Sequence, residues 1–310
     1  MKNINASNAP LMSDDDVVLE LQKALYSEVT QSKTLNEQLL KRVSFRLQAS
    51  SRRAELLKTA YRVSSLQEVL LRESSDRGTL FKCTICGFFG KFLPFGEKKR
   101  PNAQCPICHS FERTRFMMAT LDRLKYLELK NLSVLELAPT KGLHDFFRYK
   151  LSVDYLGIDI NPGLLVSKGM RVQYCDLCDG EFSRLGKFDV ILNSHVMEHI
   201  VCDPIDVIRQ LRDILNPGGI QLISVPFAGN KTISDTNPSL SAQLRLQRFG
   251  HPDHVRAFGH QDFPEALSRL FGNKFLEFVV DDIPKSEDFS LAVLTDANMN
   301  GNRLFGVFAD

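Results

Sequence analysis

Apolar positions follow two different periods along the chain, and the change between them divides it into regions. From Asp15 to Ser75 apolar residues recur every three or four positions without glycine or proline, which is typical of amphipathic helices. We expect two or three helices there, with a break near residues 49–51. Nothing in this arm, residues 1–78, has the pattern of a catalytic site. It suits helical packing, and we predict a homodimer formed through it.

After residue 129 the apolar residues form short runs that alternate with helical stretches. Five runs predict strands, at residues 133–138, 154–159, 171–175, 188–193 and 220–225. Helices are expected at about 142–149 and 204–215, and Asn216–Gly219 reads as a turn. This alternation predicts an α/β fold with a parallel sheet covered on both faces. Two later apolar segments, 275–280 and 304–309, have no long helical pattern between them, so we expect an antiparallel pair at the sheet edge.

Composition narrows the class of protein. The chain has 310 residues, of which 43% are hydrophobic and 25% charged, which is ordinary for a protein with a packed core. The formal net charge of +2 gives no overall field that would favour nucleic acid or a membrane surface. No apolar run approaches the roughly 18 residues of a membrane helix, and the N-terminus lacks the apolar stretch of a signal peptide. We therefore expect a cytoplasmic protein with no membrane span.

Four of the seven cysteines have the spacing of a structural metal site. Two C-x2-C pairs stand 18 residues apart: Cys83 and Cys86, then Cys105 and Cys108. Each pair suits a tight turn that directs two thiolates at one ion, and two such turns complete a tetrahedral zinc shell. We predict a zinc-ribbon module over residues 79–112, with His109 as the alternative to Cys108.

A third pair, Cys175 and Cys178, has no matching pair elsewhere. We expect these two residues to be ordinary buried thiols at a strand end. An odd total of seven cysteines with short spacings suits a reducing compartment better than a set of disulfides.

The predicted strands end in residues that suit a ligand site. Glu136 lies in the first strand and precedes the turn Ala138–Gly142, which has one glycine where a dinucleotide-type turn needs three. Asp159 ends the second strand, Asp176 follows the third, and the fourth ends in Asn193-Ser194-His195. Ligands of open parallel sheets bind at the carboxyl ends of the strands. We therefore predict a cofactor site at this edge, with Asp159 on a ribose.

The order of several motifs makes the chain resemble class I S-adenosylmethionine (SAM) dependent methyltransferases, and most closely a bacterial group with a cysteine-rich module before that fold. These motifs are CPICHSFERTR, VLELAP, YLGIDI, FDVILNSHVMEHI, LRDILNPGG, ISVPF and HPDHVRAFGHQDF. The resemblance implies a Rossmann-like, seven-stranded sheet over residues 113–310, whose last two strands form an antiparallel hairpin. The chain departs from most of that family in its first turn, where Ala138-Pro139 replaces the usual start.

The resemblance also implies which residues contact SAM. The first strand and its turn would border the methionine part, the second strand end the ribose and the third the adenine. Because the turn has few glycines, we expect a basic side chain after the zinc module to hold the carboxylate of SAM. The expected contacts are Glu136, Ala138, Pro139, Thr140, Gly142, Asp159, Ile160, Asp176, Leu177, Asn193, His195 and either Arg113 or Arg115.

Histidines supply the candidate chemistry, since the histidine pKa lies near the working pH of a general base. His195 and His199 are expected to flank the start of a helix, with Glu198 between them, and His199 reads most simply as a packed core residue. A later stretch provides His254 as the base, Asp253 to orient it and Arg256 to grip an anionic group of the substrate. A divalent metal such as Mg²⁺ on Glu198 and His199 is a further alternative, as in related quinone O-methyltransferases.

Three functions compete. The first is O-methylation of a sugar or glycosylated small molecule, as in polysaccharide biosynthesis, because no base-methylating motif follows the fourth strand. The second is an RNA methyltransferase that grips RNA with the zinc module, where seven Lys or Arg face two Glu between residues 79 and 116. The third is a scaffold without catalysis. We expect the first, with nucleic acid not a partner.

Overall fold

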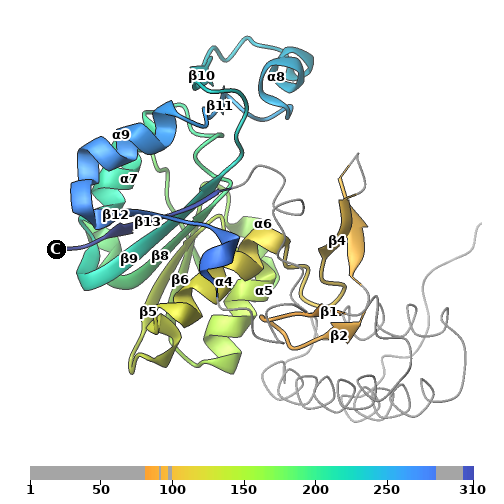
Figure 1. Ribbon diagram of the computed structural model, residues 1–310, viewed down its shortest axis with the longest axis vertical. Helices are drawn as coiled ribbons and strands as arrows, with labels where there is room; N and C mark the ends of the chain where they lie inside the picture. Colours follow the sequence, from red (N-terminus) through yellow and green to blue (C-terminus); the bar gives the residue numbers. More distant parts are fainter. Residues whose placement is uncertain (1–80, 91, 97–99, 284–302) are drawn as a thin grey trace, which may run out of the picture. The chain divides into compact units, whose positions relative to one another are not determined.

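The structure, a computed structural model, describes residues 81–90, 92–96, 100–283 and 303–310 (Figure 1). The predicted helical arm and its homodimer lie outside these residues. No helix in the described ranges is long and apolar enough to cross a membrane.

A small module of two antiparallel hairpins precedes the main sheet. Strand β1 (Phe81–Lys82) pairs with β2 (Phe89–Gly90), and β3 (Leu93–Phe95) pairs with β4 (Arg100–Gln104). Phe88 and Phe92 are buried and stack with ring centroids 6.1 Å apart, which gives the module its small apolar core. The module then runs directly into α4 (Glu112–Arg123) and a short 3-10 turn.

The main sheet has seven strands in the order β12-β13-β9-β8-β5-β6-β7. Its parallel strands are β5 (Ser133–Leu137), β6 (Asp154–Asp159), β7 (Val172–Tyr174), β8 (Phe188–Ser194) and β9 (Leu215–Val225). β12 (Phe275–Phe278) and β13 (Arg303–Phe308) pair antiparallel with each other, and β13 also pairs antiparallel with β9. The predicted seven-stranded fold and its antiparallel edge are therefore confirmed.

Helices cover both faces of this sheet. Figure 1 shows α4, α5 (Lys141–Asp145) and α6 (Gly163–Ser167) on one side and α7 (Pro204–Arg212) and α9 (Asp262–Phe271) on the other. α9 buries Phe263, Leu267 and Phe271, spaced four residues apart on one face, in the main apolar core. α7 begins where the Oδ1 of Asp203 accepts the amide of Ile205 at 2.9 Å, an N-cap that the following proline supports.

Three predicted boundaries were wrong. The helix expected at 204–215 ends at Arg212, because Leu215 is already the first residue of β9. The helix expected at 142–149 is short, because after α5 the backbone widens into a π-helical turn (Phe146–Lys150). The expected turn Asn216–Gly219 is a bulge inside β9, since Leu215 already pairs with Phe188 and Asn216 donates to Asp189 at 2.8 Å.

An insertion follows β9. It contains the β10 (Ile233–Ser234) and β11 (Arg256–Ala257) pair and helix α8 (Ala242–Phe249), which together project from the sheet in Figure 1. Its last segment returns to the carboxyl ends of the parallel strands, because the amide of Val255 donates to the carbonyl of Glu198 at 2.9 Å. The insertion therefore brings residues near position 254 to the predicted site.

Candidate active site

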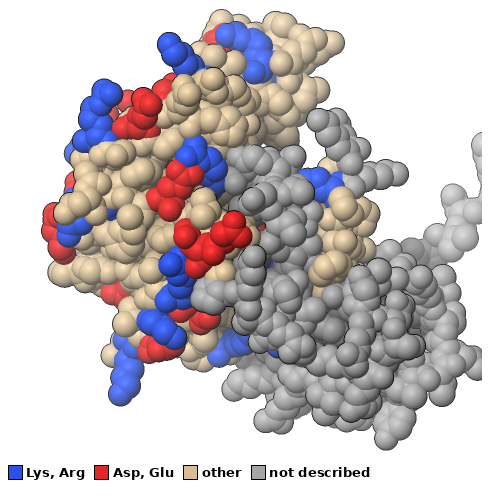
Figure 2. Space-filling model, viewed as in Figure 1, with Lys and Arg blue, Asp and Glu red and all other residues tan. Residues whose placement is uncertain are grey.

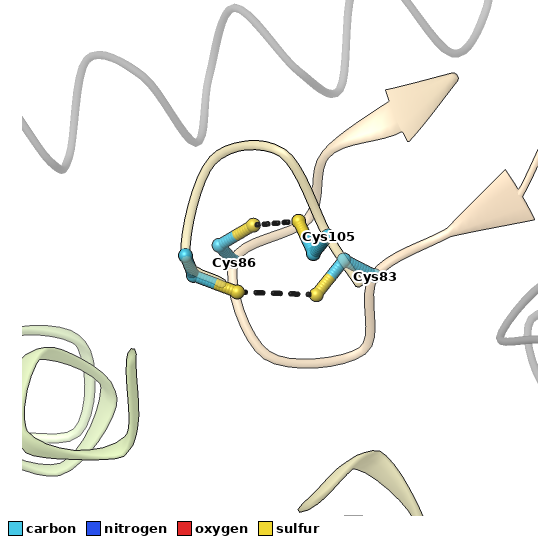
Figure 3. A group of neighbouring side chains, drawn as sticks. Cys83, Cys86 and Cys105 are labelled. Carbon is cyan, nitrogen blue, oxygen red and sulfur yellow. Dashed lines mark hydrogen bonds between the residues drawn. The ribbon is translucent and has the colours of Figure 1, made fainter. Parts of the chain in front are cut away.

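Four cysteine thiols come together in the module. Their ligand atoms all lie within 4.8 Å of one another, and Figure 3 shows the thiols of Cys83, Cys86 and Cys105 close together. The sulfurs of Cys83 and Cys108 are 3.5 Å apart, and those of Cys86 and Cys105 are 3.6 Å apart. A tetrahedral Zn²⁺ with Zn–S bonds of about 2.3 Å has sulfurs roughly 3.8 Å apart. The four thiols therefore fit a structural zinc ion with no open position.

The two cysteine turns share one backbone pattern. In each, the amide after the second cysteine donates to the carbonyl of the first, from Gly87 to Cys83 at 2.8 Å and from His109 to Cys105 at 3.0 Å. Gly87 and His109 both have a left-handed backbone, with φ of 76° and 60°. His109 thus occupies the glycine position of the second turn and is not in the cluster, which favours Cys108 as the fourth ligand.

Arg115 is a buried support of the module. Its side chain is fully buried; Nη1 donates to the carbonyl of Ser110 at 2.7 Å, Nη2 donates to that of Ala103 at 3.1 Å, and the guanidinium lies over the ring of Phe92. The expectation that Arg115 holds the carboxylate of SAM was wrong, because its donors bind backbone carbonyls of the module.

A cavity of about 380 Å³ lies at the carboxyl ends of β5, β6, β7 and β8, a size suited to a nucleoside-type ligand. Asp159 and Asp176 line it, and one oxygen of each accepts a backbone amide of the next turn, at 2.7 Å and 2.9 Å. Within the described part of the chain no hydrogen bond holds the second oxygen of either carboxylate, so both can bind a ligand. The predicted residues that line this cavity are Ala138, Asp159, Ile160, Asp176, Leu177, His195 and His199.

Sequence reasoning missed part of this wall. Ile200 and Val201 also line the cavity, and Val201 is 61% exposed. The available signal was the apolar pair itself, two residues before the helix cap Asp203, of which Ile200 also packs against the main core.

A smaller cavity of about 90 Å³ adjoins the first, and the two share Leu137 and Ala138. Arg113 lines the smaller one beside Glu136 and Thr140. The Nε of Arg113 is buried and has no hydrogen-bond partner among the described residues. Burial lowers the pKa of Arg113 to about 10, so the side chain remains cationic at neutral pH. This donor fits the carboxylate expected there.

The turn after β5 holds an unusual conformation. Ala138 has φ +47°, in the region that favours glycine. Pro139 packs on the next strand, since a Cβ on Gly157 would lie 2.7 Å from its Cγ. Glu136 holds the turn from beneath: its Oε1 accepts the amide of Thr140 at 2.8 Å, and its Oε2 accepts the hydroxyl of Tyr155 at 2.7 Å. Hydrogen bonds to the buried carboxyl group of Glu136 thus stabilise a turn that lacks the glycines usual at this place.

Glu136 makes stability depend on pH. Burial raises its pKa to about 7 from 4.5, although the hydrogen bonds from Tyr155 and Thr140 oppose the shift. Since the folded pKa is raised, the associated stability is present below pH 4.5 and is lost as pH rises through 7. We expect the free energy of unfolding of Glu136→Gln to exceed that of the parent by about 3 kcal/mol at pH 8. At pH 4.5 the two free energies should be nearly equal. Urea titrations at both pH values test this; an equal difference at both would contradict it.

Asn193 is the next-to-last residue of β8, and it lines neither cavity. It is fully buried, and neither its amide oxygen nor its nitrogen has a hydrogen-bond partner among the described residues, although buried amides are rarely left unpaired. Its contact with SAM stays a prediction.

Residues 195–200 form a turn, not the helix start that we predicted. His195 has φ +56°, and helix α7 begins only at Pro204. The guanidinium of Arg256 binds this turn: Nη1 donates to the carbonyls of Met197 and Ile200, both at 2.8 Å, and Nη2 donates to Cys202 at 3.1 Å. The expectation that Arg256 grips an anionic substrate was therefore wrong, since its donors hold backbone carbonyls.

Glu198 lies between two histidines. Its side chain is fully buried, with a carboxylate oxygen 3.2 Å from Nδ1 of His195 and 3.9 Å from Nε2 of His254. Burial alone would raise the pKa of Glu198, but the hydrogen bond and charge of His195 hold this pKa below its usual value. Glu198 is therefore a buried carboxylate at neutral pH.

Nδ1 of His254 lies 3.2 Å from the carbonyl of Phe249 and so carries the proton, because a carbonyl only accepts. Burial lowers the pKa of His254, which leaves the ring neutral at pH 7. Asp253 does not orient it, as we had expected: that carboxylate is exposed and lies 3.9 Å from His251. His199 is exposed at the cavity, not packed in the core, and its ring meets that of His254 at 4.7 Å.

Glu198, His199 and His254 also form a second group of close metal-type ligands. Two imidazoles and one carboxylate suit a transition metal, whereas Mg²⁺ prefers oxygen ligands. The expected Mg²⁺ therefore does not fit this donor set.

Cys178 forms a disulfide with Cys202 across the cavity rim. The expectation of two buried thiols holds for Cys175 alone, and the expected absence of disulfides was wrong here. No local pattern indicates this pairing, because the partners are 24 residues apart and belong to different loops.

We expect reduction of this disulfide to lower the free energy of unfolding by about 3 kcal/mol, since the bond closes a loop of 24 residues in the unfolded chain. Urea unfolding with and without dithiothreitol measures the change. A Cys178→Ser/Cys202→Ser double variant is the control and should not respond to the reductant; an equal response would trace the effect to the other cysteines.

Comparisons with known proteins agree with this fold. The ubiquinone biosynthesis O-methyltransferase of Ruegeria pomeroyi is 31% identical over 101 residues, which are 30% of this chain and 40% of that protein. The protein of the same name from Cereibacter sphaeroides is 29% identical over 141 residues, 42% of this chain and 56% of that one. The chain thus spans about half the length of these curated relatives.

Among solved structures, the plantazolicin methyltransferase BpumL in complex with SAH is similar, at 14% identity over 64% of this chain and 85% of that one, with a TM-score of 0.43. The family model described as a methyltransferase domain matches residues 109–272. Because this match covers more than half of the chain, from the second cysteine turn to the end of α9, the chain belongs to the methyltransferase-domain family.

Proposed function

We propose that this chain is a SAM-dependent O-methyltransferase. The observation that carries the proposal is the buried carboxylate of Glu198 between His195 and His254, beside a cavity lined by Asp159 and Asp176. Such a site combines a nucleoside pocket with a group able to accept a proton. Family membership supports methyl transfer, and the relatives are named as O-methyltransferases.

When bound, SAM would supply an electrophilic methyl group: the acceptor oxygen bonds to the methyl carbon in line, the carbon–sulfur bond breaks, and S-adenosylhomocysteine leaves. Asp159 and Asp176 would hold the nucleoside, and Arg113 the carboxylate of the amino-acid tail. The acceptor hydroxyl must lose its proton, and a histidine takes it.

His195 is the better candidate for that base. His195 lines the larger cavity directly after β8. His254, our choice from the sequence, does not line this cavity and packs against His199, which does. Glu198 fixes the His195 ring and stabilises the positive charge that it gains. His254, which belongs to the insertion, lies near the same carboxylate of Glu198.

The acceptor that we propose is a hydroxyl of a sugar or of a glycosylated small molecule. The names of the relatives point instead to precursors of ubiquinone, which offer phenolic hydroxyls. Both classes give the same proton transfer, so an assay must separate them.

The alternative of an RNA methyltransferase has less support. In the module, Arg100 pairs with Glu112 at 3.4 Å and Arg115 is buried. Positive and negative side chains lie beside one another on the described part of the face in Figure 2. This face lacks the uniformly basic surface that binds nucleic acid.

The test is methyl transfer from tritiated SAM to three sets of acceptors: glycosides, catechols and RNA. We expect label in a hydroxyl acceptor and a loss of about 100-fold or more in His195→Asn. Label in RNA alone, or no binding of SAM by calorimetry, would reject the proposal; the latter would favour the scaffold. Label in catechols alone would reject the sugar.

A further inference from the structure

The second cysteine turn forms a wall of the smaller cavity. His109, Ser110 and Phe111, which directly follow Cys108, line it opposite Glu136 and Thr140. The cavity therefore lies between the metal centre and the turn after β5. By contrast, none of the module residues that the structure describes lines the larger cavity.

Gly142 brings these two walls together. A Cβ at this position would lie 2.7 Å from the carbonyl oxygen of Cys108 and 3.4 Å from its Cβ. Side chains do not approach a backbone oxygen so closely, so only glycine permits the contact. Gly142, the one glycine of the turn after β5, thus permits close contact with the second cysteine turn and lines neither cavity.

Ser110 connects the thiols to the same wall. Its hydroxyl lies 3.2 Å from Sγ of Cys108 and 3.4 Å from Sγ of Cys83, and its carbonyl accepts Nη1 of Arg115. Ser110 is nearly fully buried. A change in the position of either sulfur would therefore move the cavity wall.

Arg113 is placed by this connection. α4 starts directly after Phe111, and the guanidinium of Arg113 lies over the Phe111 ring, 4.7 Å from its centre. The buried Nε of Arg113 faces no partner among the described residues. Its position depends on the residues that follow Cys108.

We propose that the four-cysteine centre is a positioning element for the subsite of the cofactor's amino-acid tail, and so sets the affinity for that tail. The inference rests on the proposed function. A ribbon of this size does not hold itself together without its ion, so loss of the metal removes one wall of the smaller cavity and displaces Arg113. The nucleoside cavity is built by the sheet and keeps its shape.

Two ligands distinguish binding at the subsite of the amino-acid tail from binding in the nucleoside cavity. S-adenosylhomocysteine (SAH) carries the amino-acid tail, whereas 5′-methylthioadenosine lacks it. Calorimetry with the full chain is run zinc-loaded, after removal of zinc by a chelator, and after zinc is restored, with circular dichroism to confirm that the sheet persists. We expect zinc removal to weaken SAH by about tenfold or more, the value of a charge-assisted hydrogen bond, and 5′-methylthioadenosine by less than about twofold. Restored zinc should restore SAH binding.

A matched pair of variants tests the same contact with zinc in place. Gly142→Ala forces Cys108 and the turn apart and should weaken SAH selectively. Gly163→Ala adds a Cβ with nothing within 4 Å and should bind both ligands as the parent does.

Four outcomes are distinguished. Selective loss of SAH supports the proposal. An equal loss of affinity for both ligands would contradict the proposal, because it would show that the centre stabilises the whole domain. Unchanged SAH affinity in the metal-free chain would also overturn it. A zinc-loaded chain that binds neither ligand refutes the proposed function instead.

Discussion

Replacement of Glu198 by glutamine should reduce the rate of methyl transfer by roughly 10²- to 10⁴-fold, the contribution of a positioned acid or base. Glutamine keeps the size of the side chain but not the charge that holds His195 at 3.2 Å. The affinity for SAH should change little, because Glu198 lines neither cavity. The loss of activity should therefore be a loss in kcat, with cofactor affinity nearly unchanged.

The titration of His254 gives a second measure of this change. Burial is the largest influence on the pKa of His254 and lowers it, whereas the charge of Glu198 raises it. Loss of the carboxylate charge should therefore lower the pKa of His254 further, which an NMR titration of its ring measures. Glu128→Gln, an exposed glutamate paired with Lys125, is the matched control. Parallel losses of rate and SAH affinity would show that Glu198 supports cofactor binding and not proton transfer.

The largest loss of stability is expected for Arg256→Met. Methionine fills most of the space but leaves the carbonyls of Met197, Ile200 and Cys202 without their donors. Each unpaired buried acceptor costs about 1–3 kcal/mol, so the free energy of unfolding should fall by about 4 kcal/mol. Transfer should fall too, since the same turn carries Glu198.

Arg248→Met is the control for this variant. Arg248 is exposed and pairs with Asp235, and such pairs contribute roughly 0–1 kcal/mol. Urea unfolding compares the two variants. A loss below about 1 kcal/mol in Arg256→Met would mean that water replaces the guanidinium and that the turn does not depend on it.

Local sequence signals predicted the sheet well. The strand 154–159 agrees at both ends, and α7 starts where Pro204 indicated. Only the start of α7 at Pro204 was predicted, since the cap by Asp203 is a finding of the structure. For the strand and for this helix start, the deciding information lies within a few neighbouring residues. The bulge in β9 was missed because its partner, Asp189, is 27 residues away.

The candidate site was predicted in part for the same reason. Strand ends follow from local pattern, and so the acids Asp159 and Asp176 were found. The turn at 195–200 was not, because its shape depends on Arg256, which is 56 to 59 residues further along the chain. The spacing of the cysteines predicted their cluster, but no pattern showed that it would reach the cofactor site through Gly142.

The position of β13 has a consequence for how the protein is made. Residues 303–308 lie between β9 and β12, both of which precede them in the chain. Until the ribosome has released this segment, β9 has an open edge and β12 has no neighbour in the sheet. Nascent chains with such an edge are prone to aggregate. A premature stop before residue 303 would thus leave a chain that keeps the residues lining both cavities but lacks the strand that joins β9 to β12.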